Sequence, residues 1–353
     1  MAKIDAIFKL VRDQGASDLH LTAGSAPMLR MDGEIHPVEY DALSAELLTE
    51  LLREMMTDVD WKAFEDEGEV DFGYEVPGVL RVRCNVFLQR KGIAGAFRIL
   101  PQKIFTVEQL GLPETVQGFS ELAKGLVVVT GPPGSGKSTT QAALIDRINR
   151  TRRTHIITIE DPIEYVHENR RSLINQREVR RHTKNFDSAL RAALREDPNI
   201  ILVGEMRDLE TIALAITAAE TGQLVFGTLH TASAAQTIDR LIDVFDAGQQ
   251  EQIRTMLGES LQGVVAQRLL KRADGKGRVA AYEVLVGNAP VRAMIREAKT
   301  FQIPSVMQTG RKAGMQLMDD CIDKLVRAGD ITAAEARKHA TQKERFREKR
   351  DAA

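Results

Sequence analysis

The segment GLVVVTGPPGSGKSTT, residues 125–140, constrains the fold of this chain more than any other. An apolar, strand-like run leads into Gly131-x-x-x-x-Gly136-Lys137-Ser138, and a helix-like segment follows. Glycines allow a tight loop whose amides face anionic oxygens, while the lysine reaches phosphate oxygens and the serine hydroxyl binds Mg²⁺. The positive end of the following helix favours the same anion. The segment therefore predicts a nucleotide-binding α/β domain.

The whole loop is expected to contact the nucleotide. Lys137 is expected at the β- and γ-phosphates, Ser138 at Mg²⁺ and Thr139 at the α-phosphate. The complete set of predicted loop contacts is Gly131, Pro133, Gly134, Ser135, Gly136, Lys137, Ser138 and Thr139.

Composition narrows the class of protein further. A length of 353 residues favours about two domains, and the formal net charge of −2 with 5% aromatic residues argues against a nucleic-acid partner. No apolar run approaches the roughly 18 residues of a spanning helix, so we expect no direct membrane insertion. The N-terminus has no signal-peptide pattern, and the two cysteines are far apart. We therefore expect a cytoplasmic protein without a structural zinc site.

Patterning along the chain predicts two domains of different construction. Residues 1–100 combine short amphipathic helices with alternating strands, which indicates a small α+β domain on an antiparallel sheet. Residues 101–120 have little periodicity and are predicted as a linker. From residue 121 to 353, strands and helices alternate, which is typical of a doubly wound parallel sheet. A charged helical region is expected from about residue 288.

Acidic side chains follow the second strand of this α/β pattern. The apolar run 154–159 is followed by Glu160, Asp161 and Glu164. Carboxylates this close together repel each other unless a cation lies among them, and a metal–nucleotide complex would supply one. The alternative is a solvated turn started by Asp161-Pro162.

Two further strands end in polar residues. NIILVG, residues 199–204, is followed by Glu205, and QLVFGTL, residues 223–229, by His230. Since carboxyl ends of parallel strands meet at one edge of a sheet, these residues are expected near the bound phosphates. A structural role for His230 is the alternative.

At this point the motifs resemble a known family. GPPGSGKST, TIEDPIE, LREDPNIILVGEMRD and GTLHTASAAQTIDRLIDVF follow one another in the order of the Walker A, Asp box, Walker B and His box motifs of the secretion ATPases. The chain looks most like the type IV pilus retraction ATPases within that family. The resemblance implies a homohexameric ring of two-domain subunits, each with a PAS-like N-terminal domain and a RecA-like ATPase domain, that hydrolyses ATP with Mg²⁺.

The resemblance also implies roles for individual residues. Glu164 matches the glutamate that activates water, with Glu160 as the alternative base. Glu205 matches the Walker B acid that holds Mg²⁺ through water, and His230 matches the residue near the γ-phosphate.

Basic residues of the N-terminal domain complete the predicted site. Arg81 and Arg83 match residues that reach phosphate as arginine fingers, and their spacing puts both on one face of a strand. Arg98 is a further candidate of the same kind. The alternative for this group is an ordinary solvated sheet face.

Four positions depart from the pattern of the family. Pro133 replaces a small polar residue and removes one amide donor from the loop. Asn199 stands where an Asp is usual, Arg180 where glycine is expected, and Pro290 where Ala is frequent.

The predicted function is a hexameric motor ATPase that powers type IV pilus retraction and twitching motility. Its expected partners are the inner-membrane platform protein of the pilus machine and a paralogous retraction ATPase, which places the ring at the membrane base of that machine. The open alternatives are an accessory retraction ATPase, a RecA-like nucleic-acid translocase and a nucleotide-gated scaffold without turnover. The intact acids argue against the scaffold.

Overall fold

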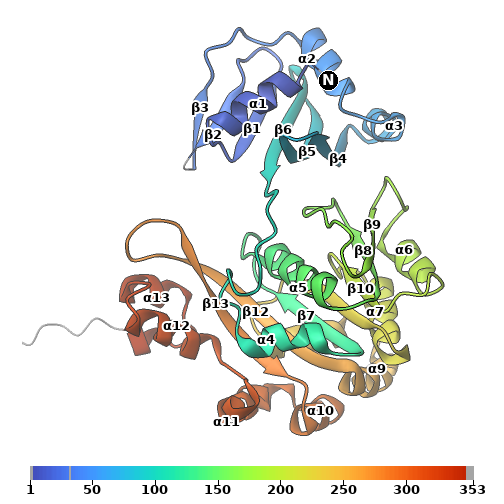
Figure 1. Cartoon of the computed structure of the whole chain (residues 1–353), viewed down its shortest axis with the longest axis vertical. Helices are drawn as coiled ribbons and strands as arrows, with labels where there is room; N and C mark the ends of the chain where they lie inside the picture. Colours follow the sequence, from blue (N-terminus) through green and yellow to red (C-terminus); the bar gives the residue numbers. More distant parts are fainter. Residues whose placement is uncertain (1–2, 32, 347–353) are drawn as a thin grey trace, which may run out of the picture. The chain divides into compact units, whose positions relative to one another are not determined.

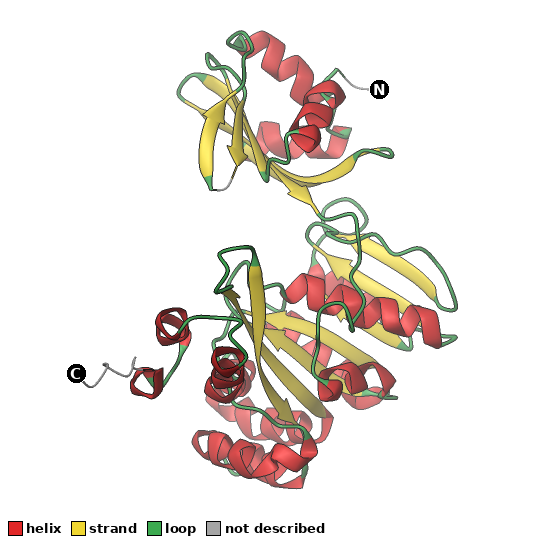
Figure 2. Ribbon diagram, turned by 60° about the vertical axis from the view of Figure 1, so that its left-hand side comes forward, coloured by secondary structure: helices red, strands yellow, loops and turns green. Residues whose placement is uncertain are grey.

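The computed structural model describes residues 3–31 and 33–346. The chain forms two compact units (Figures 1 and 2). The first contains the chain up to Ile104 together with Glu160–Val166 and Arg177–Lys184. The second contains Phe105–Ile159, His167–Gln176 and the chain from Asn185 onward. The two short segments in the first unit come from the part of the sequence predicted as the ATPase domain, and the domain bounds 1–100, 101–120 and 121–353 stay a prediction.

The first unit is built on a six-stranded antiparallel sheet with the order β3-β2-β1-β6-β5-β4. Helices α1, α2 and α3 pack their apolar stripes into one core with its strands. Its elements are α1 Asp5–Asp13, β1 Asp18–Thr22, β2 Met28–Met31, β3 Glu34–Pro37, α2 Ala45–Arg53, α3 Asp58–Glu67, β4 Glu69–Val76, β5 Leu80–Gln89 and β6 Gly92–Leu100.

Local sequence explains where these helices begin. Ser44 caps α2 by accepting from the amide of Leu47, and Thr57 and Asp60 form a capping box at the start of α3. Strand β5 alternates as its sequence predicts, with Val82 and Cys84 fully buried on the core face. The opposite face of the sheet is therefore left to polar side chains.

The second unit is built on a seven-stranded sheet with the order β13-β12-β7-β11-β10-β8-β9. The pairs from β12 through β8 are parallel, and β13 is antiparallel to β12. Strands β7, β10 and β11 are buried along their whole length, which explains their continuous apolar sequences. The sheets of the two units confirm the predicted fold class.

Helices and 3-10 turns complete the second unit. The strands are β7 Gly125–Thr130, β8 His155–Glu160, β9 Leu173–Glu178, β10 Ile200–Val203, β11 Leu224–Leu229, β12 Leu261–Lys271 and β13 Arg278–Val286. The helices are α4 Glu114–Gly118, α5 Lys137–Thr151, α6 Phe186–Ala193, α7 Leu209–Thr221, α8 Ala234–Asp243, α9 Ala247–Ser260, α10 Ala289–Arg296, α11 Ile303–Thr309, α12 Met318–Arg327 and α13 Ala333–His339, with 3-10 turns at Phe119–Glu121, Thr300–Gln302, Gly310–Ala313 and Lys343–Phe346.

Most of the segment predicted as a linker belongs to the core of the second unit. Val107, Leu112, Val116 and Phe119 are all buried against its sheet and helix α5. Burying an apolar side chain of this size stabilises a fold by roughly 1.5–3 kcal/mol. The segment lacks periodicity because its apolar residues come from turns and one short helix.

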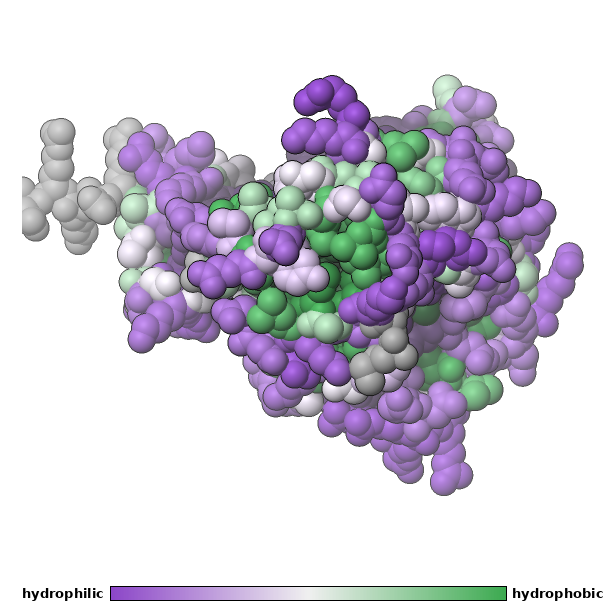
Figure 3. Space-filling model, turned by 90° about the horizontal axis from the view of Figure 1, so that it is seen from above, coloured by the Kyte–Doolittle hydropathy of each residue, from purple (hydrophilic) through white to green (hydrophobic). Residues whose placement is uncertain are grey.

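Figure 3 shows one face of the molecule, on which apolar side chains gather near the middle with hydrophilic side chains around them. Within residues 3–31 and 33–346, no helix is long and apolar enough to cross a bilayer.

Candidate nucleotide-binding and hydrolysis site

The phosphate loop joins β7 to α5, and glycines shape it. Gly131, Gly134 and Gly136 have φ angles of 144°, 74° and 89°, a region that other residues rarely adopt. A Cβ on Gly131 would also lie 2.3 Å from the carbonyl oxygen of Gln267. The loop therefore requires glycine where the motif places it.

Lys137 begins helix α5 and is 9% exposed. Its Nζ donates to the carbonyl oxygens of Gly131 at 2.9 Å and Pro132 at 3.2 Å, and lies 3.4 Å from Nδ1 of His230. The Ser135 hydroxyl is buried and has no hydrogen-bond partner among the described residues. A cation, an orphaned hydroxyl and the amino end of a helix together fit a phosphate ligand.

Gln267 of β12 packs against the phosphate loop and was not among the residues predicted for the site. It is 3% exposed, and its Oε1 accepts from Thr140 Oγ1 at 2.8 Å. A Cβ on Gly136 would lie 2.8 Å from its Nε2. The sequence gives little signal for this role, because β12 also carries Gln262, Arg268 and Lys271 and nothing in its pattern singles out Gln267.

Glu205 follows β10 and meets His230 from the end of β11. Glu205 Oε1 lies 2.9 Å from His230 Nε2 and 2.6 Å from Arg207 Nε. Burial acts to raise the pKa of Glu205, but Arg207 and His230 outweigh it and hold the pKa below its ordinary value. The structure thus brings together two of the predicted residues and adds an ion pair with Arg207.

Threonine side chains fix the loop that carries His230. Thr231 donates its amide to Thr130 Oγ1 at 2.9 Å, and the two hydroxyls lie 2.8 Å apart. The Thr231 hydroxyl also lies 2.6 Å from that of Thr237 in helix α8. The end of β7, the His box loop and α8 are therefore tied together by hydroxyl groups.

A cavity of about 420 Å³ lies beside the phosphate loop, a size within the usual range for small-molecule sites. Its lining consists of Pro132, Pro133, Gly134, Ser135, His230, Thr231, Ala232, Arg268, Leu269, Arg278, Lys338 and His339. Arg268, Arg278 and Lys338 add positive charge and were missed from the sequence, because only the fold brings β12, β13 and α13 to the loop.

The acidic loop, Glu160–Val166, belongs to the first unit, whereas the phosphate loop belongs to the second. Glu160, Asp161 and Glu164 all lie in the segment that packs with the first unit. Glu160 and Glu164 are half-buried and Asp161 is exposed. Their predicted roles at a nucleotide stay predictions.

Arg83 and Arg98 are cross-strand neighbours on the polar face of the first unit's sheet. Their side chains are 43% and 72% exposed. They line a cavity of about 380 Å³ with His20, Arg30 and Asp18. Burial acts to raise the pKa of Asp18, but hydrogen bonds from Ser17 and Arg98 outweigh it and lower that pKa.

The pKa of His20 on the same face is lowered, first by burial and then by Arg30. A neutral histidine beside exposed guanidinium groups leaves the arginines as the cations of this face.

Arg81 shares their strand, but its surroundings differ. Its side chain is only 16% exposed and contacts Glu75, Ile163 and Glu178. Of the three predicted phosphate-binding arginines, Arg83 and Arg98 are therefore the exposed ones.

Mg²⁺ fits the donor groups of this site when it arrives with a nucleotide. Residues 3–31 and 33–346 contain no cluster of three His, Cys, Asp or Glu side chains suited to a metal. Mg²⁺ usually takes one or two protein oxygens and receives the rest from phosphates and water. The Ser138 hydroxyl at the start of α5 and the Glu205 carboxylate are oxygen donors of that kind.

The structure shows the local surroundings of the four departures from the family pattern, of which Pro133 and Asn199 have no structural explanation. Arg180 has φ 69°, which explains why glycine is expected there. Asn199 accepts from the His155 amide through its side chain, and Pro290 lies in the first turn of α10, where proline is tolerated. Pro133 is exposed in the loop.

Residues 1–351 match the family described as "Type II/IV secretion system protein". The chain belongs to this family. It is 54% identical over 333 residues to the "Type IV pilus retractation ATPase PilT" of Pseudomonas aeruginosa, which covers 94% of this chain and 96% of that protein. It is 52% identical to a "Twitching motility protein" of Neisseria gonorrhoeae, over 90% of this chain and 85% of that one.

Solved structures agree with the sequence relatives. The structure of the pilus retraction motor PilT with bound ADP matches with a TM-score of 0.89 and 48% identity, over 98% of both chains. The Legionella pneumophila ATPase DotB matches with a TM-score of 0.84 and 28% identity, over 95% of this chain and 94% of that chain.

Proposed function

We propose that this chain is an ATP-hydrolysing motor that powers retraction of type IV pili. The observation that carries the proposal is the 54% identity to the Pseudomonas aeruginosa retraction ATPase, because it extends over nearly the full length of both chains. The alternative of an accessory retraction motor has less support, since the P. aeruginosa ATPase PilU is 36% identical.

ATP binding is assigned to the second unit. The backbone of Gly131–Gly136, the Ser135 hydroxyl and Lys137 surround the phosphates, and Thr139 contacts the α-phosphate. A solved relative with bound ADP supports nucleotide binding by this chain. The cationic lining of the neighbouring cavity adds to the attraction for phosphate.

Hydrolysis is assigned to acids and arginines around the γ-phosphate. Glu164 accepts the proton of the attacking water, with Glu160 as the alternative base. His230 contacts the γ-phosphate, while Arg83 and Arg98 of a neighbouring subunit stabilise its developing charge. Ser138 and Glu205 would hold Mg²⁺, which would supply polarisation of the phosphate oxygens when bound.

The proposed assembly is a homohexameric ring of subunits with a PAS-like and a RecA-like domain. We place it in the cytoplasm at the inner-membrane base of the pilus machine. Its proposed partners are the platform protein there and a paralogous retraction ATPase.

Deletion of the gene in its host tests the direction of the motor. Loss of a retraction motor should leave excess surface pili and abolish twitching, whereas bald cells would indicate an extension motor and overturn the proposal. Restoration by the wild type and by Lys276→Ala, an exposed lysine in the β12–β13 turn, but not by Lys137→Ala, should link the phenotype to nucleotide binding.

Phosphate release by the purified proteins tests the enzyme assignment separately. Wild type and Lys276→Ala should turn over ATP, and Lys137→Ala should lose on the order of 100-fold or more. Equal, negligible release from all three would support the scaffold alternative.

A further inference from the structure

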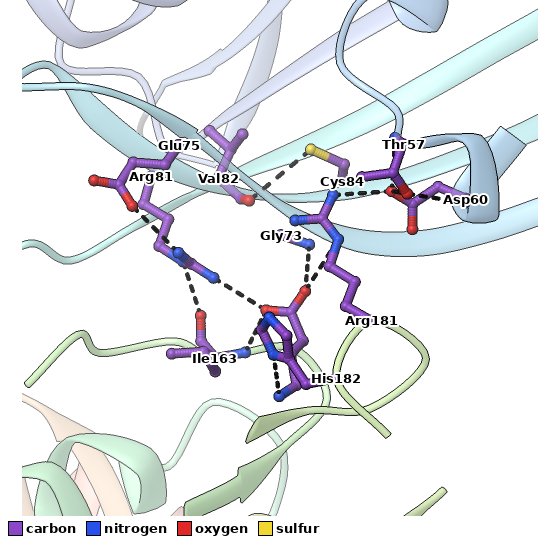
Figure 4. A network of polar contacts seen from close by, with 11 residues as sticks. Thr57, Asp60, Gly73, Glu75, Arg81, Val82, Cys84, Ile163, Arg181 and His182 are labelled. Carbon is purple, nitrogen blue, oxygen red and sulfur yellow. Dashed lines mark hydrogen bonds and ion pairs between the residues drawn. The ribbon is translucent and has the colours of Figure 1, made fainter. Parts of the chain in front are cut away.

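We propose that Arg81 and Glu178 are positioning residues that hold the acidic loop, Glu160–Val166, on the sheet of the first unit. The inference rests on the proposed function for the role of Glu164. Figure 4 shows part of the network that carries it, with Arg81 of β5 directed toward Ile163 in the loop. The Glu178 carboxylate joins the two, because it contacts both Arg81 and the amide of Ile163.

Glu178 is a buried acid with donors on several sides. It is 2% exposed. Its Oε2 lies 3.0 Å from Arg81 Nη2 and accepts from the amide of Ile163 at 3.1 Å. Its Oε1 accepts from the amide of Gly73 in β4 at 3.4 Å. A buried carboxylate is tolerated only with such partners, so the loop and the sheet are both needed around it.

Arg81 binds the backbone carbonyl group of Ile163, whose amide group is bound by Glu178. Its Nε donates to the carbonyl oxygen of Ile163 at 3.0 Å, and its Nη1 lies 3.4 Å from Glu75. Arg81 and Glu178 therefore bind both the C=O and the N–H of Ile163. That residue directly precedes Glu164, so the pair fixes the backbone next to the proposed base.

Arg181 provides a second attachment for the chain that carries Glu178. Its Nη2 lies 2.9 Å from Asp60, and its guanidinium lies 5.5 Å from the ring centroid of Phe72. Asp60 is itself fixed, because it accepts from the Thr57 amide and hydroxyl in the capping box of α3. Arg181 thus connects the segment that carries Glu178 to helix α3 of the first unit.

Gly73 leaves the room that the pair occupies. A Cβ at this position would lie 2.8 Å from Arg81 Nη2 and 3.1 Å from Glu178 Oε2. Its φ is not positive, so a methyl group here would strain no backbone and would instead push against the ends of the Arg81 and Glu178 side chains. Gly73→Ala therefore disturbs the pair without removing any charge.

These contacts distinguish Arg81 from its neighbours. The Nε, Nη1 and Nη2 atoms of Arg81 all face acceptors within the chain. Arg83 and Arg98 are far more exposed. An arginine finger needs a guanidinium that can leave its own chain, which suits Arg83 and Arg98 and not Arg81.

The test compares turnover, ATP affinity and amide exchange of residues 160–166 in the full-length assembled protein. Arg81→Ala, Glu178→Gln and Gly73→Ala should each accelerate this exchange about tenfold or more, because the loop loses its attachment. They should lower kcat about tenfold or more, with the ATP Kd within about twofold, since the phosphate loop is untouched. Arg81→Lys should be intermediate, because a lysine cannot bind Ile163 and Glu178 in the same bidentate manner.

Matched variants separate positioning from direct contact. Arg83→Ala should lower kcat and leave the exchange of residues 160–166 unchanged, and Arg12→Ala, on the exposed side of α1, should change neither. If Arg81→Ala lowers kcat without faster exchange, Arg81 acts as a finger and the positioning role is wrong. Unchanged kcat and exchange would also overturn it. A wild type that fails to hydrolyse ATP, with exchange still dependent on Arg81, would instead contradict the proposed function.

Discussion

The phosphate loop and the acidic loop both follow strands of the same α/β sequence pattern, but the protein holds them by different means. The phosphate loop is fixed by glycine geometry, neutral side chains such as Gln267, and the start of a helix. The acidic loop is fixed by buried charges, with Glu178 between Arg81 and Arg181.

The difference has a functional consequence. The two loops belong to separate compact units, so on the proposed roles ATP binding and ATP hydrolysis should depend on different contacts. Changes at the first loop should weaken binding, whereas changes at the second should reduce turnover of ATP that is already bound.

Among changes around the phosphate loop that leave Lys137 in place, the largest effect should be on the Mg²⁺ dependence of ATP binding. Glu205→Gln keeps the shape of the side chain and removes its charge, so half-saturation of ATP binding should need about 10–100-fold more Mg²⁺. Fluorescent-ATP binding at a series of Mg²⁺ concentrations measures this. Glu210→Gln, exposed in the first turn of α7, is the matched control. With EDTA, all three proteins should bind alike, and a difference that persists there would exclude a metal role for Glu205.

The next largest effect should come from removing the contact of Gln267 with the start of helix α5 beside the phosphate loop. Gln267→Ala removes the acceptor of the buried Thr140 hydroxyl. Loss of such an acceptor lowers the free energy of unfolding by about 1–3 kcal/mol. We expect ATP to bind about tenfold more weakly, with little change in kcat at saturation. Gln249→Ala, exposed in α9, serves as the control. A loss of kcat with unchanged affinity would contradict the division between the two loops.

The stability of the second unit should depend on pH below neutrality through His167, without any effect on function at neutral pH. Burial lowers the pKa of His167 to about 4. The unfolded chain binds a proton at higher pH than the folded one, so stability falls as pH drops from about 6.5 toward 4.

At pH 5 this linkage corresponds to about 2 kcal/mol of unfolding free energy. His167→Gln should remove that loss, which urea unfolding at pH 7 and pH 5 would detect. His36→Gln, exposed in β3, should behave as the wild type. Equal pH dependence in all three proteins would mean that His167 is not buried in its neutral form.

The sequence predicts the phosphate loop well because its determinants are local. Gly131, Gly136 and Lys137 lie within seven consecutive residues whose spacing is set by the ligand. Parallel strand ends likewise predict that Glu205 and His230 lie at one edge of the sheet, and the structure brings the two side chains into contact. The fold class follows from the same periodicity.

The attachment of the acidic loop was not predictable in this way. Arg81 and Glu178 are 97 residues apart, and the segment around Glu178 reads as an ordinary basic loop. Alternation places Arg81 and Arg83 on one face, but it does not show which of them is covered. The role of Gln267 could not be predicted either, because it is one of several polar residues in β12 and the strand pattern does not show which of them meets the phosphate loop.

The proposed division of roles assigns hydrolysis to the acidic loop and binding to the phosphate loop. ATP affinity and phosphate release of Glu164→Gln, measured beside the wild type and Glu160→Gln, test this division. We predict that Glu164→Gln binds ATP within about twofold of the wild type and releases phosphate at least about 100-fold more slowly. Affinity that falls in step with turnover would contradict the division of roles, and undiminished turnover would exclude Glu164 as the base.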